Sequence, residues 1–505
     1  MTNEDQESRD IGLSSLGSIS EGAGLFLFGT GISRGIGFII NVILTRSLGA
    51  SLYGMYAYVN VLLSLFQISA KLGGDKSVLR YIPAYEDNDR MQHIMLTLAY
   101  GTSLVAGTAV AAAMYYFAPV ISRYTLSDPL FVSVVRIAAI VVPFNSFAQI
   151  TYSAFKSIDR MDYNVATSSI AQPTLRLIFI SGAILLGYSV VGATAALVVS
   201  SLLVSLIAIV VLSKRTNLGE VNRPTRENAR EYYNFSVPLM FNQAGNFLYN
   251  RVDILIVGFL LTGSAVGIYN IAVAVSSFLI LPLSAFNQIF TPTASRLYHE
   301  GNLQELESVY RTVTRWSFTL SLFPAIATVL YAGDILQIFG EGFTEGKVVL
   351  SLFVFAQLTN SLVGPSGLLL MMSDHQYLTL ANQLSSGITN AILNYVLIIE
   401  YGFIGAALAT ASVLAGINVL RVIEVWYLEG ISPYSRKYFK PIAAGAFSGL
   451  MMYGFSLILE DYMLVLIGSV VGAGCFAISL YVLGIEKEEA KLAKGAYSKA
   501  ANKML

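Results

Sequence analysis

The stretch VVGATAALVVSSLLVSLIAIVVL, residues 190–212, contains no charged side chain. A helix of roughly 20 apolar residues crosses the hydrocarbon core of a bilayer, so this stretch predicts a membrane-spanning helix. The whole chain has the same character: 55% of its 505 residues are hydrophobic, 12% are charged, and the mean hydropathy is +0.64. Soluble domains carry about 25% charged residues. The composition therefore indicates an integral membrane protein and excludes a soluble or disordered one.

Similar apolar runs follow one another along the chain and predict an all-α, polytopic protein with about fourteen transmembrane helices. The runs are continuous and do not alternate between apolar and polar residues, which argues against membrane-spanning strands. The predicted spans are 22–45, 53–71, 93–117, 131–155, 163–187, 190–212, 232–261, 266–290, 310–332, 344–372, 378–399, 402–428, 438–458 and 461–484.

Several function classes are disfavoured by the same residues. Lys and Arg together number 31, as do Asp and Glu, so the basic excess of a nucleic-acid binder is missing. The single cysteine, Cys475, cannot form an internal disulfide. The three histidines do not have the spacing of metal ligands: they are His93, His299 and His375. The predicted loops are short and contain no phosphate-binding glycine motif. We therefore expect no enzyme and no cofactor or metal, while proton or sodium coupling stays open.

The distribution of basic residues predicts the orientation in the membrane. Most of the 31 Lys and Arg residues fall in the two tails and in the loops on the same side as the tails. The opposite loops hold only Arg46, Arg123 and Lys347. By the positive-inside rule, a multi-pass protein of the cell membrane with both termini in the cytoplasm is expected.

Short motifs recur at nearly one offset. Gly54-Met55-Tyr56 matches Gly267-Ile268-Tyr269, and Tyr188 with Gly192-Ala193 matches Tyr401 with Gly405-Ala406, each 213 residues later. Because each copy contains six spans, both copies enter the membrane from the same side, which predicts two parallel six-helix repeats related by an axis along the membrane normal. The last two helices lie outside the repeat. Facing bundles of this kind are typical of alternating-access transporters, and a duplicated scaffold without a cavity is the alternative.

The expected organisation follows from the spans and the repeat. It comprises a cytoplasmic acidic tail (1–21), an N-lobe of six helices (22–212), a basic cytoplasmic linker (213–231), a C-lobe of six helices (232–428), two appended helices (438–484) and a basic cytoplasmic tail (485–505).

Four charged residues fall deep inside predicted spans: Arg34, Arg176, Arg251 and Asp253. A charge at the bilayer centre costs roughly 2.5–3.5 kcal/mol on insertion scales, so each one needs a partner or a wet cavity. Arg251 and Asp253 are two residues apart and point to nearly opposite sides of a helix, so they do not pair with each other. Arg34 and Arg176 are then the candidate partners for Asp253.

Amides extend these positions into polar stripes. Arg34 and Asn41 share one helix face, and the steps from Asn242 through Asn246 and Asn250 to Asp253 define a second face. A third stripe contains Asn382, Ser386, Asn390 and Asn394 at steps of four. Each stripe is opposed by an apolar face that can meet lipid, so the polar faces are expected to meet one another.

Guanidinium groups fit phosphate oxygens, and amides hydrogen-bond to sugar hydroxyls. The stripes therefore favour an anionic, polar cargo such as a phosphorylated sugar lipid. The candidate substrate-binding residues are Arg34, Asn41, Arg176, Asn242, Asn246, Asn250, Arg251, Asp253 and Asn390.

The segment Leu44–Tyr56 resembles the junction of the first two helices in the polysaccharide transporter family, the Wzx-like oligosaccharide flippases of the multidrug/oligosaccharidyl-lipid/polysaccharide exporter superfamily. The segment from Phe235 through Pro238 and Asp253 to Gly267-Ile268-Tyr269 resembles the seventh and eighth helices of that family. The resemblance covers nearly the whole chain.

The resemblance implies a flippase that moves a polyprenyl- or dolichyl-linked oligosaccharide from the cytoplasmic to the outer leaflet, for surface polysaccharide or glycoprotein assembly. In such a protein Arg34, Arg176 and Arg251 would contact phosphate, and Asp253 would balance the arginines or take a coupling ion. The expected partners are this lipid, membrane lipids and glycosyltransferases of the same pathway, without nucleic acid. The alternatives are an ion-coupled efflux antiporter of the same superfamily and a non-transporting membrane scaffold.

Overall fold

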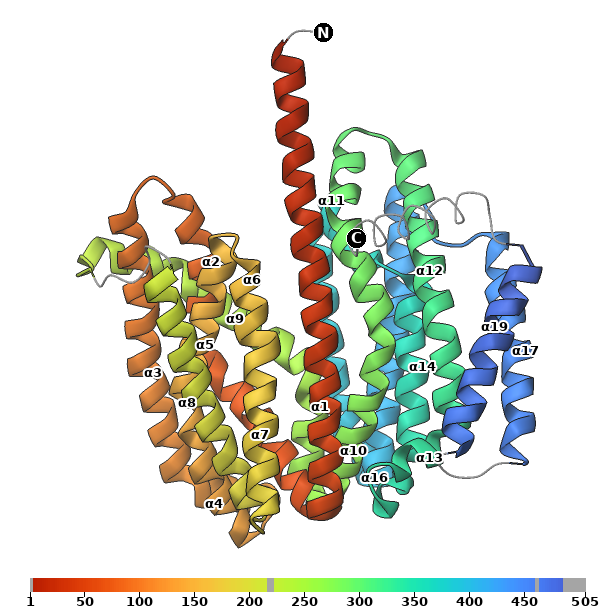
Figure 1. The fold of residues 1–505 in the computed structure, drawn as a ribbon, viewed down its shortest axis with the longest axis horizontal. Coiled ribbons are helices and arrows are strands. Elements are labelled where there is room, and N and C mark those ends of the chain that lie inside the picture. Colours follow the sequence, from red (N-terminus) through yellow and green to blue (C-terminus); the bar gives the residue numbers. More distant parts are fainter. Residues whose placement is uncertain (1–2, 216–221, 459–462, 485–505) are drawn as a thin grey trace, which may run out of the picture. The chain divides into compact units, whose positions relative to one another are not determined.

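The computed structural model describes residues 3–215, 222–458 and 463–484. This part of the chain is built from helices and contains no strand, which confirms the all-α prediction (Figure 1). Ten helices of the described residues are long and apolar enough to cross a membrane, as expected for a multi-pass membrane protein. The number fourteen stays a prediction, because two of the ten each contain two predicted spans, and two further predicted spans fall on α9 and α17, which are not among the ten. The predicted C-terminal tail, 485–505, lies outside the described residues.

Two of the ten spans are helices broken at a glycine. α1 (Asn3–Lys71) joins the first two predicted spans across Gly49, whose φ is 70° and ψ 176°. α16 (Gln376–Glu429) joins two more across Gly402, whose φ is 58° and ψ −142°. Both backbone conformations are available to glycine at little cost and are strained for other residues. α1 begins at Asn3, so the helix includes most of the segment predicted as an N-terminal tail.

The helices form two compact units. The first consists of the described residues up to Ile271 together with Leu380–Thr410. Its helices after α1 are α2 (Gly74–Ala84), α3 (Asp89–Arg123), α4 (Pro129–Ala139), α5 (Val141–Ser157), α6 (Met161–Asn164), the π-helix η1 (Val165–Ala171), α7 (Gln172–Leu185), α8 (Val190–Arg215), α9 (Arg226–Leu260) and the start of α10 (Gly263–Ser276).

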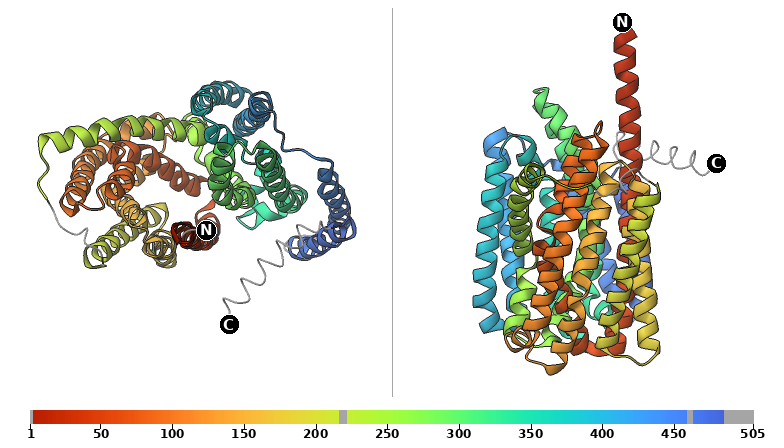
Figure 2. Two further views of the ribbon diagram at one scale, coloured as in Figure 1. Left: turned by 90° about the horizontal axis from the view of Figure 1, so that it is seen from above. Right: turned by 90° about the vertical axis from the view of Figure 1, so that its left-hand side faces the viewer.

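Within this first unit, α8 packs against α5 and α7, and α3 packs against α4 and α5. Figure 2 shows these helices nearly end-on from above, with α9 (yellow-green) strongly tilted relative to them. A cluster of buried apolar side chains between α2, α3 and α5 includes Val78, Met95 and Phe155. α1 packs against α7 and α9, and residues of α1, α7, α9 and α10 line a common space.

The second unit contains Ala272–Thr379 and the described residues from Ala411 onward. Its helices are the 3₁₀ turn η2 (Ser277–Ile280), α11 (Leu281–His299), α12 (Leu303–Leu330), α13 (Ala332–Gln337), the 3₁₀ turn η3 (Glu341–Gly346), α14 (Lys347–Val363), α15 (Ser366–Met372), the 3₁₀ turn η4 (Arg436–Tyr438), α17 (Phe439–Ser456), the π-helix η5 (Leu464–Gly468) and α19 (Ser469–Val482). α12 is the central element and packs against α11, α14 and α17.

Several helices begin earlier than their apolar runs predict, because polar residues cap them. Asn302 accepts a hydrogen bond from the backbone of Glu305 and starts α12 seven residues before the predicted span. Thr225 and Asn228 form a reciprocal capping box that starts α9 at Arg226. Side chains of this kind satisfy the first free N–H groups of a helix. Hydropathy therefore indicates the part of a helix that lies in the membrane, whereas the capping residues indicate where the helix begins.

Repeat-related glycines meet at one helix crossing. A Cβ on Gly54 would lie 1.7 Å from the carbonyl oxygen of Gly263, and a Cβ on Gly267 would lie 2.3 Å from that of Ala50. The backbones of α1 and α10 therefore touch at this point, and only glycine allows the approach. The recurrence of Gly54 and Gly267 in the sequence thus marks a contact between corresponding parts of the two repeats.

Candidate functional site

Two cavities in the first unit are lined by polar side chains. One, of about 280 Å³, lies between α1, α7, α9 and α10, and includes Asn41, Tyr53, Arg251 and Asn270 in its wall. The other, of about 320 Å³, lies between α1, α5, α7 and α8. Asn60, Ser64 and Arg176 line both. The two cavities are therefore neighbours that share one basic and two neutral polar side chains.

Arg176 is the charged residue common to both cavities. It lies on α7, one turn after the π-helix η1, a kind of local irregularity that is frequent at functional sites. One guanidinium nitrogen donates to Oδ1 of Asn60 at 2.5 Å, and the guanidinium carbon is 5.9 Å from the ring centre of Tyr56. Its Nε is buried and has no hydrogen-bond partner, and among the described residues no carboxylate pairs with it. The cavity thus holds a cation whose partners are all neutral.

A hydrogen-bonded amide cluster completes the wall of the first cavity. The hydroxyl of Tyr53 donates to Oδ1 of Asn41 at 3.2 Å and accepts from the amide of Asn270 at 2.8 Å. Arg251 is exposed and has no hydrogen-bond or ion-pair partner among the described residues. Two guanidinium groups and several amides therefore line one small space, a set that suits a phosphate and sugar hydroxyls.

The predicted residue Arg34 lies elsewhere. It is half-buried on α1 and does not line either cavity, although Gly37 and Asn41 farther along the same helix do. Of the predicted site residues, the structure brings together Asn41, Arg176 and Arg251 around the first cavity.

Asp253 faces away from that cavity, as its angular offset from Arg251 predicts. It is 4% exposed and accepts a hydrogen bond of 2.7 Å from the hydroxyl of Tyr269 and one from the backbone of Ile254. It pairs with neither Arg34 nor Arg176, so the pairings considered from the sequence are not found. A hydroxyl group on another helix can thus stabilise this buried carboxylate by a hydrogen bond, without a cation. The sequence alone does not reveal this partner.

Asn390 belongs to a second amide cluster on the other side of α9. It accepts from the amide of Asn394 at 2.9 Å and from the hydroxyl of Thr410 at 3.2 Å, and Thr410 also reaches Tyr269. Oδ1 of Asn394 is buried without a partner. Asp253, Tyr269, Thr410, Asn390 and Asn394 thus form a continuous polar cluster, separate from the arginine-lined cavities.

The predicted stripes meet only in part. On α16 the stripe Asn382, Ser386, Asn390 and Asn394 is buried, while Leu384, Ile388 and Ile392 on the opposite face are exposed, as expected for a face toward lipid. On α9 the side chain of Asn246 accepts a hydrogen bond from Gln383 of α16. Asn242 and Asn250 of the same stripe are exposed and line neither cavity, whereas Phe247 and Arg251, on another face of α9, line the first one.

Several cavity residues are not among the site residues predicted from the sequence: Tyr53, Tyr56, Asn60, Asn270, Gln149 and Gln172. Asn60 and Asn270 interrupt apolar runs and were visible as isolated amides, but they form no stripe with neighbours on their own helices. Tyr53 and Tyr56 fall within the segment that resembles the family, and Tyr56 belongs to the recurring motif, but neither is marked as a cavity residue in a chain with 29 tyrosines.

Fold and site together define a multi-pass helical membrane protein with a basic, amide-lined cavity inside one helical unit. The model of the family described as "Polysaccharide biosynthesis protein" matches residues 19–298, and the chain belongs to this family. The MatE model matches residues 238–396. The predicted resemblance to Wzx-like transporters of the exporter superfamily, which are not enzymes, is confirmed.

Two relatives from Haloferax volcanii carry the name flippase. "Probable low-salt glycan biosynthesis flippase Agl15" is 26% identical over 433 residues, which cover 85% of this chain and 86% of the relative. "Probable flippase AglR" is 28% identical over 37% of this chain and 40% of its own.

The fold matches that of solved transporters. The inward closed conformation of the lipid II flippase MurJ superposes with a TM-score of 0.74 and 16% identity, covering 91% of this chain and 98% of that one. A multidrug resistance MATE family transporter in an inward-facing conformation gives a TM-score of 0.58 at 16% identity, over 80% of this chain and 94% of that one. At such identities these likenesses concern the fold.

Proposed function

We propose that this protein is a flippase that carries a lipid-linked oligosaccharide from the cytoplasmic to the outer leaflet by alternating access. The observation that carries the proposal is Arg176, a guanidinium held in a cavity with only neutral partners. A cation in such a place is costly unless an anion joins it, and the phosphate of a polyprenyl or dolichyl carrier provides one. The flippase names of the relatives and the match to the polysaccharide biosynthesis family support the same function.

The amides around Arg176 fit the other half of the cargo. Asn41, Asn60 and Asn270 present both donors and acceptors to the cavity, as sugar hydroxyls require. The lipid chain stays in the bilayer in this mechanism. Glycosyltransferases that build the glycan are the proposed protein partners.

Reconstituted vesicles test the function directly. Protein is placed in vesicles with a fluorescent lipid-linked oligosaccharide, and an impermeant quencher reports the fraction of headgroups on the outside over time. We expect quenching to proceed toward completion in protein-containing vesicles and to stop near one half in empty ones. Equal kinetics in the two preparations would disprove the proposal.

The orientation is proposed from the distribution of basic residues, with both termini in the cytoplasm. In a Cys475→Ser background, an impermeant thiol reagent added to intact cells should label Arg123→Cys and spare Lys76→Cys. Both parent side chains are exposed, so accessibility differs only by side of the membrane. The reverse labelling would invert the proposed topology.

We further propose that the Asp253 cluster couples transport to a cation, a proton or sodium. A buried carboxylate that accepts from Tyr269, with the unpaired oxygen of Asn394 in the same cluster, offers oxygen ligands or a proton site. Asp253→Asn keeps the shape and removes the charge. We expect an imposed pH or sodium gradient to accelerate flipping by the parent protein and to have no effect on the variant.

Asp128→Asn is the matched control for this prediction. Asp128 caps α4 by accepting from the backbone of Leu130, and asparagine caps a helix as well as aspartate does. The control should keep its response to the gradient. A gradient response that survives in Asp253→Asn would place the coupling site elsewhere.

The match of the MatE model to residues 238–396 favours one other function, ion-coupled efflux of small molecules. An efflux protein would confer drug resistance that depends on Asp253 and does not require Arg176. Resistance assays with Asp253→Asn and Arg176→Ala therefore separate the two functions.

A further inference from the structure

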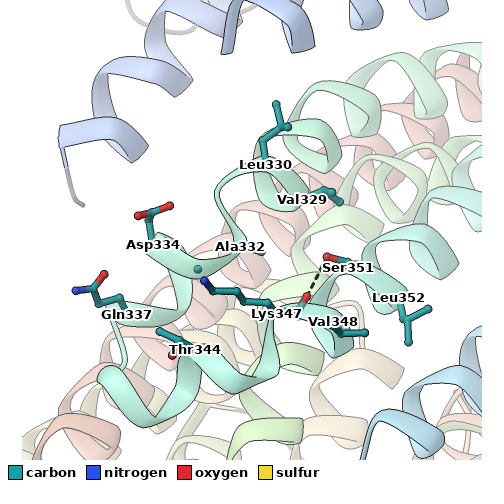
Figure 3. Close-up of a pocket in the computed structure, with 11 residues that line it drawn as sticks. Val329, Leu330, Ala332, Asp334, Gln337, Thr344, Lys347, Val348, Ser351 and Leu352 are labelled. Carbon is teal, nitrogen blue, oxygen red and sulfur yellow. Dashed lines mark hydrogen bonds between the residues drawn. The ribbon is translucent and has the colours of Figure 1, made fainter. Parts of the chain in front are cut away.

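A pocket in the second unit combines charged and apolar walls. It has a volume of about 570 Å³ and lies between the end of α12, the short helix α13 and the start of α14 (Figure 3). Lys347, Asp334, Gln337, Thr344 and Ser351 contribute its polar side chains. Two helices with the properties of membrane spans end and begin here, at Leu330 and Glu341. The pocket is therefore at the level expected for lipid headgroups.

The two charged residues of this pocket form no ion pair within the part of the chain that the structure describes. Lys347 makes no side-chain hydrogen bond or ion pair with the described residues. Its side chain lies over Gly333, and a Cβ built on Gly333 would be 2.7 Å from Nζ of Lys347. Asp334 is half-buried, lines the same pocket and likewise has no ion-pair partner there. Figure 3 shows the end of the Lys347 side chain near the segment that carries Asp334, whose carboxylate points away from it. One cation and one anion, not paired with each other, thus face a common space.

An apolar groove continues from this pocket. It has a volume of about 380 Å³, is lined by Phe355 and Leu358 of α14 and by Gly445, Ala446 and Gly449 of α17, and shares Val329 and Leu330 with the pocket. Beside the groove, α17 lies close to α12, since a Cβ on Gly445 would already lie 2.8 Å from Leu322. A charged pocket and an apolar groove thus form one amphipathic surface along α12, α14 and α17.

We propose that this surface binds a zwitterionic phospholipid of the surrounding membrane, with its phosphate at Lys347, its ammonium group at Asp334 and an acyl chain in the groove. Charge complementarity selects this ligand, because an anionic lipid would leave Asp334 opposed by like charge, and a soluble glycan would leave the apolar groove empty. The alternative is a lysine that only extends its ammonium group to water, and that alternative does not account for the adjoining groove or for the carboxylate in the same pocket. The bound lipid would hold α12, α14 and α17 together at one membrane surface.

Native mass spectrometry of the detergent-purified full chain tests the proposal. The probes are phosphatidylethanolamine, phosphatidylglycerol and the uncharged diacylglycerol with the same chains. We expect phosphatidylethanolamine to bind most tightly and Lys347→Ala to weaken its binding about fivefold, the effect of one basic residue near a membrane surface. Asp334→Asn should remove the preference over phosphatidylglycerol. Ala446→Phe, which fills the groove, should weaken both phospholipids.

Two variants serve as controls and should bind like the parent protein. Arg123→Ala removes an exposed basic side chain at the end of another span, and Leu450→Phe enlarges an exposed residue of α17 that does not line the groove. Equal binding of diacylglycerol, equal losses in Arg123→Ala and Lys347→Ala, or unchanged binding in Ala446→Phe would each overturn the proposal. The measurement involves no transport, so its outcome is independent of the proposed flippase activity.

Discussion

Arg176→Ala should lower the rate of oligosaccharide flipping about 10- to 100-fold, because a hydrogen bond to a charged group is worth about 1.5–3 kcal/mol. The variant removes the one guanidinium that lines both cavities of the first unit. Arg176→Lys keeps the charge and loses the planar fork that contacts phosphate through two bonds, so an intermediate rate is expected. The vesicle assay, normalised to reconstituted protein, provides the measurement.

Asn60→Asp sharpens this prediction. The new carboxylate would stand at the position of Oδ1 of Asn60, 2.5 Å from the guanidinium of Arg176, and would form an ion pair with it. A phosphate would then have to displace an internal anion, so flipping should fall as far as in Arg176→Ala although the arginine is present. Asn60→Ala, which leaves the guanidinium without a competitor, should retain more activity than Asn60→Asp.

Arg136→Ala is the control for loss of a charge within a membrane helix. Arg136 is exposed on α4, lies over the ring of Tyr115 and lines neither cavity, so its removal should leave the rate unchanged. If Arg176→Ala instead reduces only the amount of folded protein, with a normal rate per molecule, then Arg176 has a structural role and the cargo site lies elsewhere.

The second large effect is expected at the crossing of α1 and α10. Gly54→Ala should destabilise the protein by about 3 kcal/mol or more, the upper end for overpacking, because its methyl group would overlap the rigid backbone at Gly263. Thermal unfolding followed by size-exclusion chromatography should show a lower midpoint and a reduced yield of monodisperse protein. Gly267→Ala should behave similarly, since its Cβ meets the carbonyl of Ala50.

Gly101→Ala controls for the substitution itself. Gly101 lies inside α3 with no atom within 4 Å of its Cβ position, so alanine there should be neutral or slightly stabilising through its helix propensity. A normal thermal midpoint for Gly54→Ala would show that the two helices do not approach as closely as the structure indicates.

The sequence by itself determined the class of protein. Lipid is the only solvent for runs such as 190–212, so hydropathy placed most of the helices correctly. The sequence also showed that Arg251 and Asp253 point in different directions, because helical periodicity fixes the direction of each side chain around the helix axis. The recurring glycine motif pointed to the crossing at Gly54 and Gly267, where a missing Cβ is required by contact with another backbone.

Only the tertiary structure decided which polar faces meet. Periodicity gives the face of a helix but not its neighbour. Arg34 and Arg176 both fall deep inside predicted spans, yet of the two only Arg176 reaches Asn60 and the cavities. For the same reason the partner of Asp253 proved to be the hydroxyl of Tyr269 and not a guanidinium. A binding site inside a helical bundle is made by several helices at once, and their mutual rotation and tilt are set by packing of side chains far apart in the sequence.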